Sequence, residues 1–205
     1  MKKSIILSLA LVAPAFAGEP VAPVTVVEPA PAPAPCWAVE VGPHYTLATR
    51  HLGTGAGDLD MGGIDITGLY NVDDKWAVTL RFSWAEGDAY CPHEHNTDTQ
   101  EYFVKDVDGQ AWSIMPGVRY TSPITEDLDW FVGANVGINN LELETAWESH
   151  DATGFGYSAE TGLKYQVIDN LYIYGAVQVS GSTADPHGIR HQFGYGIRAG
   201  VGFEF

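Results

Sequence analysis

From Trp37 to the last residue, bulky apolar residues alternate with small or polar ones, and this period of two is typical of β-strands. The clearest stretch spans residues 192–205, where glycine fills most of the positions between the apolar ones. Its apolar positions are Phe193, Tyr195, Ile197, Ala199, Val201, Phe203 and Phe205. Similar segments occur at residues 37–47, 64–72, 76–85, 112–120, 130–138, 155–165 and 171–179. The pattern predicts an all-β domain of eight strands.

The polar face of these strands is small and balanced in charge, and this balance indicates that the polar face is the buried one. It carries four acidic and four basic side chains: Glu40, Asp65, Glu160, Glu204, Arg81, Arg119, Lys164 and Arg198. Charges on a buried face are tolerable when they are mutually paired and hydrogen-bonded. We therefore expect these residues to form ion pairs inside the domain, and the bulky face to point outward toward lipid.

Aromatic residues and connection lengths both favour a membrane-spanning barrel. The aromatic residues fall at the two ends of the strands, about 9 to 11 residues apart, as in the two aromatic girdles of an outer-membrane barrel. Short connections at residues 71–75, 121–127 and 167–170 alternate with long ones at 50–63, 86–109, 140–154 and 180–191. The predicted fold is an eight-stranded antiparallel up-and-down transmembrane β-barrel with short periplasmic turns and long outer loops.

The first 35 residues differ in composition from the rest of the chain. Residues 1–17 combine a basic start, a short apolar core and a small-residue pattern at 15–17, which together are typical of a cleaved signal peptide. Residues 18–35 consist mainly of alanine, valine and proline, and they favour an extended polyproline II conformation. We interpret residues 18–35 as a periplasmic spacer and residues 36–205 as the barrel.

The C-terminal stretch "YGIRAGVGFEF" resembles the signal that outer-membrane proteins present to the barrel-assembly machinery. It ends in an aromatic residue, and apolar residues alternate before it: Tyr195, Ile197, Ala199, Val201, Phe203 and Phe205. Residues 37–205 as a whole resemble the small eight-stranded outer-membrane barrels of the OmpA-like, OmpX-like and opacity-protein group. The resemblance implies a location in the outer membrane, contact with its lipid, and assembly through the C-terminal strand.

The chain carries a strong negative charge that is concentrated in the predicted outer loops. The formal net charge is −16, and 14 of the 26 acidic residues fall in the four long connections, where Arg50, Lys105 and Arg190 oppose them. An acidic surface repels nucleic acid and other polyanions, and it attracts cations and basic proteins. We therefore expect no nucleic-acid partner, and we consider an extracellular protein or host surface as a partner.

Residues 89–96, "AYCPHEHN", suggest a metal site in the second outer loop. Three potential ligands alternate there on one face of an extended segment, and thiolate together with imidazole favours Zn²⁺ or Cu²⁺. Other loops could supply more ligands, so the full set of candidates is Cys91, His93, His95, His150, His187 and His191. The alternative is that these loops are simply polar and that the ligands never converge. No cofactor is expected other than such a divalent metal.

The two cysteines provide a separate expectation. Cys36 precedes the first strand at the predicted periplasmic rim, whereas Cys91 lies in an outer loop. A disulfide requires Cα atoms within about 7 Å of each other. We therefore expect the two cysteines not to be bonded to each other.

The narrow interior of an eight-stranded barrel, which side chains just fill, argues against a general pore. The favoured function is a structural and surface-interaction role in the cell envelope. The alternatives are a surface adhesin with a protruding hairpin near residues 139–147, and a barrel that binds a divalent metal at its loops. A remote alternative is a surface protease similar to the omptins, because the loops contain Asp106, Asp108, Asp185 and His187. We expect no enzymatic activity.

The interpretation of the N-terminus predicts the mass of the mature protein. If residues 1–17 form a signal peptide, the protein isolated from outer membranes begins at or near Gly18, and intact-mass measurement of the purified protein checks this. A membrane-embedded protein that retains Met1 would contradict the interpretation.

Overall fold

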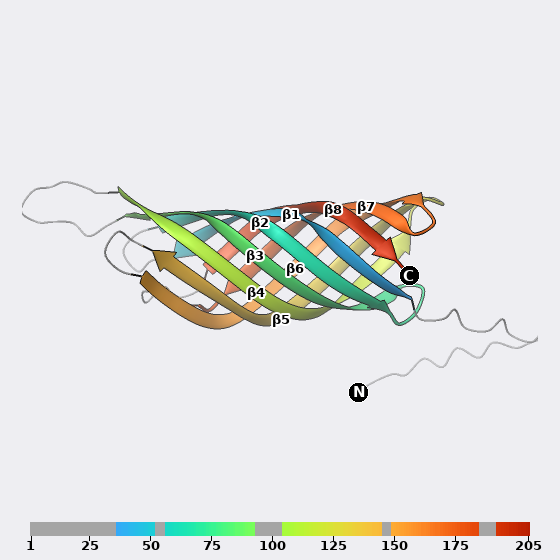
Figure 1. Ribbon diagram of the computed structural model, residues 1–205, viewed down its shortest axis with the longest axis horizontal. Coiled ribbons are helices and arrows are strands. Elements are labelled where there is room, and N and C mark those ends of the chain that lie inside the picture. Colours follow the sequence, from blue (N-terminus) through green and yellow to red (C-terminus); the bar gives the residue numbers. More distant parts are fainter. Residues whose placement is uncertain (1–35, 52–55, 93–103, 145–148, 185–191) are drawn as a thin grey trace, which may run out of the picture. The chain divides into compact units, whose positions relative to one another are not determined.

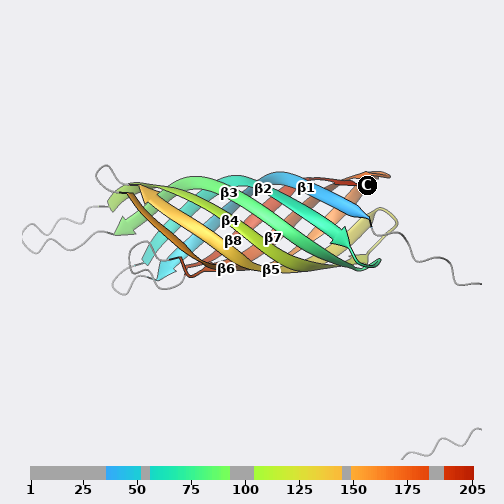
Figure 2. The same cartoon turned by 60° about the horizontal axis from the view of Figure 1, so that its bottom comes forward.

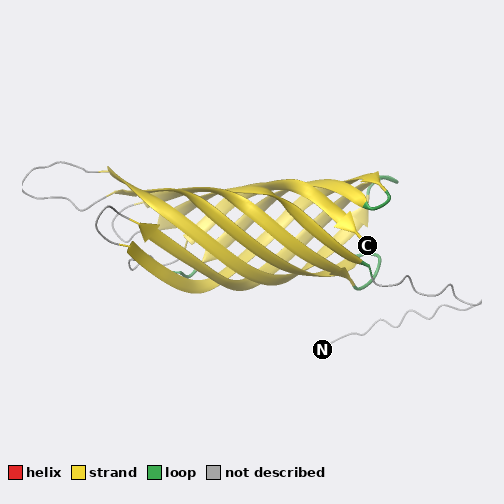
Figure 3. Cartoon of the chain, viewed as in Figure 1, coloured by secondary structure: helices red, strands yellow, loops and turns green. Residues whose placement is uncertain are grey.

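The computed structural model describes residues 36–51, 56–92, 104–144, 149–184 and 192–205. These residues form long strands joined by turns (Figures 1 and 3). The strands are β1 (Trp37–His51), β2 (Ala56–Asn71), β3 (Trp76–Pro92), β4 (Val104–Pro123), β5 (Leu128–Glu144), β6 (Ser149–Ile168), β7 (Leu171–Ser182) and β8 (Gln192–Glu204). Within the described ranges, no helix is long and apolar enough to cross a membrane.

The strands close into an antiparallel barrel, in which each strand pairs with its neighbours in the chain and β8 pairs with β1. At the closure, Val39 lies opposite Phe203 and Tyr45 lies opposite Ile197. The strands tilt strongly around the barrel axis (Figure 2), and the C-terminus lies at the end that carries the short turns (Figure 1). We call the opposite end the outer end. The predicted all-β, eight-stranded antiparallel barrel is confirmed.

Bulky apolar side chains cover the outside of the barrel wall. Ile64 and Leu80 are 53% and 56% exposed, whereas Arg81, on the inward face of β3, is 2% exposed. This distribution is the reverse of that in a soluble barrel, and it fits a wall that faces lipid. Aromatic side chains gather at the end with the short turns, where the ring centroids of Trp37 and Tyr70 lie 4.7 Å apart.

The strands extend into all four predicted outer loops, so the loop boundaries expected from the sequence are corrected. The strands continue to His51, Pro92, Glu144 and Ser182, and they resume at Ala56, Val104, Ser149 and Gln192. The expected loops at residues 50–63, 86–109, 140–154 and 180–191 are therefore too long. The strands remain paired beyond the apolar wall, but there their outward side chains are polar. The sequence pattern of a membrane strand therefore ends before the strand does.

The polarity of the two faces reverses toward the outer end. Along most of β5 the apolar side chains point outward, but Leu141 and Leu143 are 1% and 2% exposed while Glu144 is exposed. The buried leucines belong to an apolar cluster that several strands share: Ala48, Leu59, Met61, Ala85, Leu141, Leu143 and Ala184. The outer part of the barrel is thus built like a soluble β-barrel, with an apolar core and an acidic surface.

Two tyrosines fill the inner half of the barrel by lying against a face made of glycine. Tyr172 and Tyr174 on β7 are 1% and 5% exposed. The Tyr172 ring occupies the space that a Cβ atom would take at Gly202 of β8, whereas a Cβ atom at Gly200 would meet first the Val41 carbonyl oxygen and then the Tyr174 ring. Gly202 is therefore required by the close approach of a tyrosine ring, and Gly200 mainly by the close approach of the β1 backbone.

Replacement of Gly202 with valine should lower the free energy of unfolding by about 1–3 kcal/mol, the usual cost of overpacking, because the new side chain would collide with the Tyr172 ring. Urea-induced unfolding in lipid vesicles measures this change. The control Ala199→Val adds similar bulk on the lipid-facing side of the same strand and should change stability by less than about 0.5 kcal/mol. Equal stability of G202V and the parent protein would contradict the packing of this ring.

Candidate functional site

A network of charged side chains crosses the middle of the barrel, with Glu160 of β6 at its centre. Its carboxylate accepts hydrogen bonds from three guanidinium groups: Arg81 at 2.5 Å, Arg119 at 3.2 Å and Arg198 at 2.6 Å. The side chains of these four residues are at most 4% exposed. Two further acids complete the network, so that three arginines face three carboxylates.

Glu40 and Asp65 are the other two acids of the network. Arg119 donates two hydrogen bonds to Glu40, at 2.5 and 2.9 Å, and the Tyr172 hydroxyl donates a third at 3.0 Å. Arg198 donates from Nε to Asp65 at 2.6 Å. An unpaired charge costs several kcal/mol in a buried site. Because every guanidinium here meets at least one carboxylate, the network is compatible with the barrel interior.

The remaining two charged residues of the inward face meet at the end with the short turns. Lys164 Nζ lies 2.7 Å from Glu204 Oε1 and 3.8 Å from Asp129 Oδ2, and it sits over the Tyr172 ring. These side chains are partly exposed. All eight charged residues that the alternation assigns to the interior therefore lie on the inward face, and each of them contacts a residue of opposite charge.

The network lies between two cavities of the barrel. The outer cavity has an empty volume of about 840 Å³, including its opening, and Asp65 and Arg81 line it at the network end. The other cavity, of about 910 Å³ including its opening, is lined by Cys36, Lys164 and, at the network, Arg119. A solute that passed through the barrel would have to displace paired charges, which is costly in a buried site.

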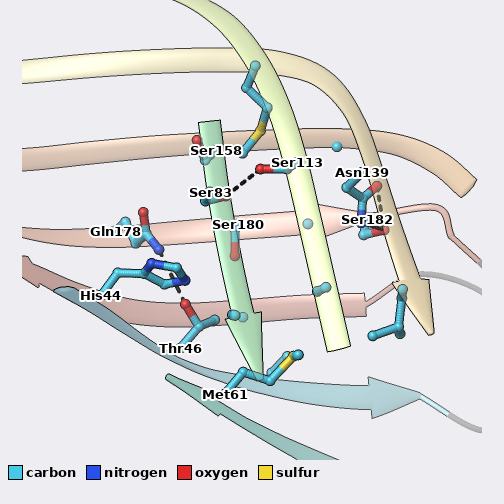
Figure 4. A pocket seen from close by; sticks show the side chains of 18 of the residues that line it. His44, Thr46, Met61, Ser83, Ser113, Asn139, Ser158, Gln178, Ser180 and Ser182 are labelled. Atoms are coloured by element: carbon cyan, nitrogen blue, oxygen red, sulfur yellow. Dashed lines mark hydrogen bonds between the residues drawn. The ribbon is translucent and has the colours of Figure 1, made fainter. Parts of the chain in front are cut away.

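Hydroxyl and amide side chains line the outer cavity, and the sequence reasoning did not single them out. The Ser83 and Ser113 hydroxyls form a hydrogen bond of 2.5 Å, and Asn139 Nδ2 donates to the Ser182 hydroxyl at 2.7 Å (Figure 4). These residues come from β3, β4, β5 and β7, so only the strand register brings them together. Their signal in the sequence is their inward position in each strand, which does not by itself distinguish a cavity from a filled interior.

Carboxylates form rows on the outside of the barrel, beyond the apolar wall. We call these residues the acidic rows: Glu86, Asp88, Asp108, Glu142 and Glu144. The register of β3, β4 and β5 places Asp88 opposite Asp108, and Asp108 opposite Glu144. Like charges that lie directly opposite each other destabilise a sheet. A cation or a basic side chain bound to this surface would therefore reduce the repulsion between its carboxylates.

The candidate metal ligands are only partly described. The backbone of Cys91 lies near the end of β3 and that of His150 in β6, so neither residue is in a loop as expected. The other candidates lie outside the described residues: His93, His95, His187 and His191. Within the described part of the chain, no group of three or more His, Cys, Asp or Glu could hold a metal ion. The loop metal site stays a prediction.

The two cysteines lie at opposite ends of the barrel. Cys36 precedes Trp37, which pairs with Tyr70 beside the first short turn, whereas Cys91 pairs with Lys105 at the outer end. The Cys36 thiol is free, and its sulfur accepts a hydrogen bond from Asn71 Nδ2 at 2.9 Å. This separation is the one expected from the topology.

The residues that resemble an assembly signal face outward along the end of the chain. All six are exposed: Tyr195, Ile197, Ala199, Val201, Phe203 and Phe205. The backbone of Phe205 exchanges two hydrogen bonds with that of Trp37, at 3.0 and 2.9 Å, so the last residue takes part in the closure of the barrel. Recognition of this face by the assembly machinery stays a prediction.

A family model described as the outer membrane protein beta-barrel domain matches residues 5–205. The chain belongs to this family of outer-membrane β-barrel proteins. In this outer-membrane barrel, the apolar wall is the membrane-spanning part, and the acidic rows lie beyond it on the side away from the short turns. No curated protein matches the chain.

Solved structures of small outer-membrane proteins have the same fold as this outer-membrane barrel. Neisserial surface protein A matches with a TM-score of 0.62 and 15% identity, covering 82% of this chain and 97% of that one. Ail of Yersinia pestis, solved with the heparin analogue sucrose octasulfate, matches with a TM-score of 0.52 and 16% identity over 83% and 99%. OprG of Pseudomonas aeruginosa matches with a TM-score of 0.52 and 14% identity, covering 84% of this chain and 96% of that one. At these identities the likeness concerns the fold.

Replacement of Glu160 with glutamine should lower the free energy of unfolding by about 3–5 kcal/mol, because it leaves three buried guanidinium groups short of a carboxylate. The matched control is Glu204→Gln, which removes a carboxylate from a partly exposed pair and should cost about 1 kcal/mol or less. Urea-induced unfolding in lipid vesicles measures both. Similar losses in the two variants would show that Glu160 is not the centre of the network.

Proposed function

We propose that this outer-membrane barrel has a structural and surface-interaction role in the cell envelope, and that its acidic rows bind cationic partners. The observation that supports the proposal is the reversal of polarity at the outer end. At the outer end, paired strands carry carboxylates on their outward side, beyond the lipid. Their inward side is packed by Leu59, Leu141 and Leu143. Sites on strands are held more precisely than sites on loops. The surface is thus a preformed binding face.

Electrostatics defines the class of partner for this face. The neighbouring carboxylates of Asp88, Asp108 and Glu144 repel one another, and a basic protein segment or a divalent cation would relieve that repulsion. Nucleic acid and other polyanions would increase it. The structure of Ail contains a heparin analogue, which is a polyanion; for the present chain we propose partners of the opposite charge.

The proposal includes the route of the chain to the membrane. Residues 1–17 would direct export and be removed, residues 18–35 would act as a periplasmic spacer, and the outward face of β8 would be read by the assembly machinery. The apolar wall would then contact outer-membrane lipid, and the short turns would face the periplasm. This orientation places the acidic rows on the cell surface, where they can meet extracellular partners.

A second candidate function is that of an adhesin, and the lengths of the strands favour it. β6 pairs with β5 from Ser149 onward, but its pairing with β7 begins only at Gly156. Residues 149–153 of β6 therefore extend beyond the paired part of β7. A strand from another protein could add to this segment through backbone hydrogen bonds. Of the hairpin expected near residues 139–147, residues 139–144 belong to β5, and the remainder lies outside the described residues.

The metal-binding and protease alternatives depend on parts of the chain that are not described. Asp106 and Asp108 lie on β4, whereas Asp185 and His187 lie outside the described residues. The metal alternative needs His93 and His95 in addition to Cys91. We therefore keep both as lesser alternatives, and we propose no enzymatic activity.

The acidic rows can be tested by neutralising three of their carboxylates. In the variant Asp88→Asn/Asp108→Asn/Glu144→Gln, binding of a fluorescent lysine-rich peptide to cells that display the barrel should fall several-fold at low salt. The difference should vanish at high salt, because salt screens interactions between exposed charges. The matched control neutralises three exposed acids of the short turns: Asp74→Asn, Glu126→Gln and Asp127→Asn. An equal loss in the control, or no loss in the test variant, would refute binding by the acidic rows.

The structural role can be separated from binding in a deletion strain. Loss of the barrel should increase the sensitivity of the cells to detergent, and both the parent protein and the neutralised variant should restore resistance. If only the parent protein restores it, the acidic rows themselves contribute to envelope integrity. Unchanged sensitivity of the deletion strain would refute a structural role.

A further inference from the structure

The outer cavity is lined at its two ends by different kinds of side chain. At one end lie Asp65 and Arg81, which belong to the paired charge network. At the other end lie Leu59, Met61 and Leu141, which belong to the apolar cluster. The cavity therefore offers one polar end and one apolar end within a single hollow.

His44 adds an imidazole ring to the polar end of the cavity. Its side chain is 7% exposed and lines the cavity, and its Nδ1 lies 3.4 Å from Asp65 Oδ1. Within the described residues, Nδ1 has no hydrogen-bond partner. Figure 4 shows the imidazole beside Gln178 and Thr46 in the cavity wall. Nδ1 is buried and lies on the side of Asp65, so a bound molecule would contact the remainder of the imidazole ring in the cavity wall.

The wall between the two ends carries hydroxyl groups on several strands, among them Ser83, Ser113, Ser158 and Ser180. A hydroxyl can donate or accept a hydrogen bond, and it does not require a charged partner. The wall can therefore accept a neutral hydroxyl or amide group in more than one orientation.

The electrostatics of the cavity disfavour an ion. The network at its inner end has three arginines facing three carboxylates, which leaves no surplus charge to balance an ionic ligand. The apolar cluster at the outer end is a barrier to ions, because an ion that crosses it loses hydration without gaining a partner. An uncharged molecule meets a much smaller barrier.

We propose that the outer cavity is a binding site for a small uncharged molecule with one apolar end and one hydrogen-bonding end, such as an aromatic or aliphatic alcohol. The hydrogen-bonding end lies toward His44 and the serine hydroxyls, and the apolar end lies against Leu59, Met61 and Leu141. Without its opening, the cavity has a volume of about 140 Å³, close to the roughly 150 Å³ of a cavity that holds benzene. This site is independent of the acidic rows, which lie on the outside of the barrel.

Methionine methyl groups report on this cavity directly. The chain has three methionines, and both of those within the barrel, Met61 and Met115, line the cavity. In protein labelled with ¹³C at the methionine methyl groups and folded in detergent micelles, titration with benzyl alcohol should shift both signals in a saturable way. Benzoate and benzylammonium at the same concentrations should cause no saturable shift. Absence of the benzyl alcohol shift, or equal shifts with the charged analogues, would overturn the proposal.

A variant that fills the cavity distinguishes binding inside the barrel from partition into the micelle. Ala85→Phe places a ring in the cavity and should weaken the benzyl alcohol response at least tenfold, whereas Val78→Phe, on the lipid-facing side of the same strand, should leave it unchanged. Retention of the response in A85F would show that the alcohol acts from the micelle and would overturn the proposal. Ala111→Leu, on the cavity wall of β4, serves the same purpose if A85F does not fold, as judged by its gel mobility before and after heating.

Discussion

The interaction on which the rest of the structure depends is the pairing of three arginines with three carboxylates at the barrel axis. In lipid, every backbone N–H and C=O group of the wall needs a hydrogen-bond partner, and closure into a barrel supplies one for each. A barrel of eight strands has an interior that is just wide enough for side chains to fill. Most bulky apolar residues lie on the outside, so the middle of the interior carries charges, and a few large rings such as Phe131 and Tyr172 pack beside them. Glu160 reconciles these demands because one carboxylate serves all three guanidinium groups.

The sequence alone predicts the membrane part of the fold well, because lipid imposes one rule on every strand there. Alternation identifies the eight strands and places charged residues such as Arg81 and Glu40 on the inward face. It fails at the outer ends, where Leu141 and Leu143 keep the inward direction of β5 but are apolar. A rule that equates apolar with outward has single exceptions in the inner half, such as Phe131, and it fails throughout the outer end. Where the chain leaves the lipid, the same alternation has the opposite meaning.

The sites are less predictable than the fold, because each one joins residues from several strands. Ser83 and Ser113 meet through the register of β3 and β4, and nothing near either residue in the sequence indicates the partner. His44 reads as one polar residue in a strand, and only the packing shows its imidazole beside Asp65 in the wall of a cavity. The acidic surface is an intermediate case. Composition shows that the outer part is negative, but the direct opposition of Asp88 and Asp108 depends on the pairing.

The reversal of polarity along the strands also determines how deeply the barrel sits in the bilayer. If the barrel moved through the bilayer toward the side of its short turns, carboxylates such as Asp88 and Glu144 would enter hydrocarbon, where a charged group is costly. Movement in the other direction would draw Trp37 and Trp76 away from the headgroup region that suits their rings. The distance between these two limits is set by paired backbone and cannot change easily. Lipid of unmatched thickness must therefore deform around the protein, since the barrel cannot shift to accommodate it.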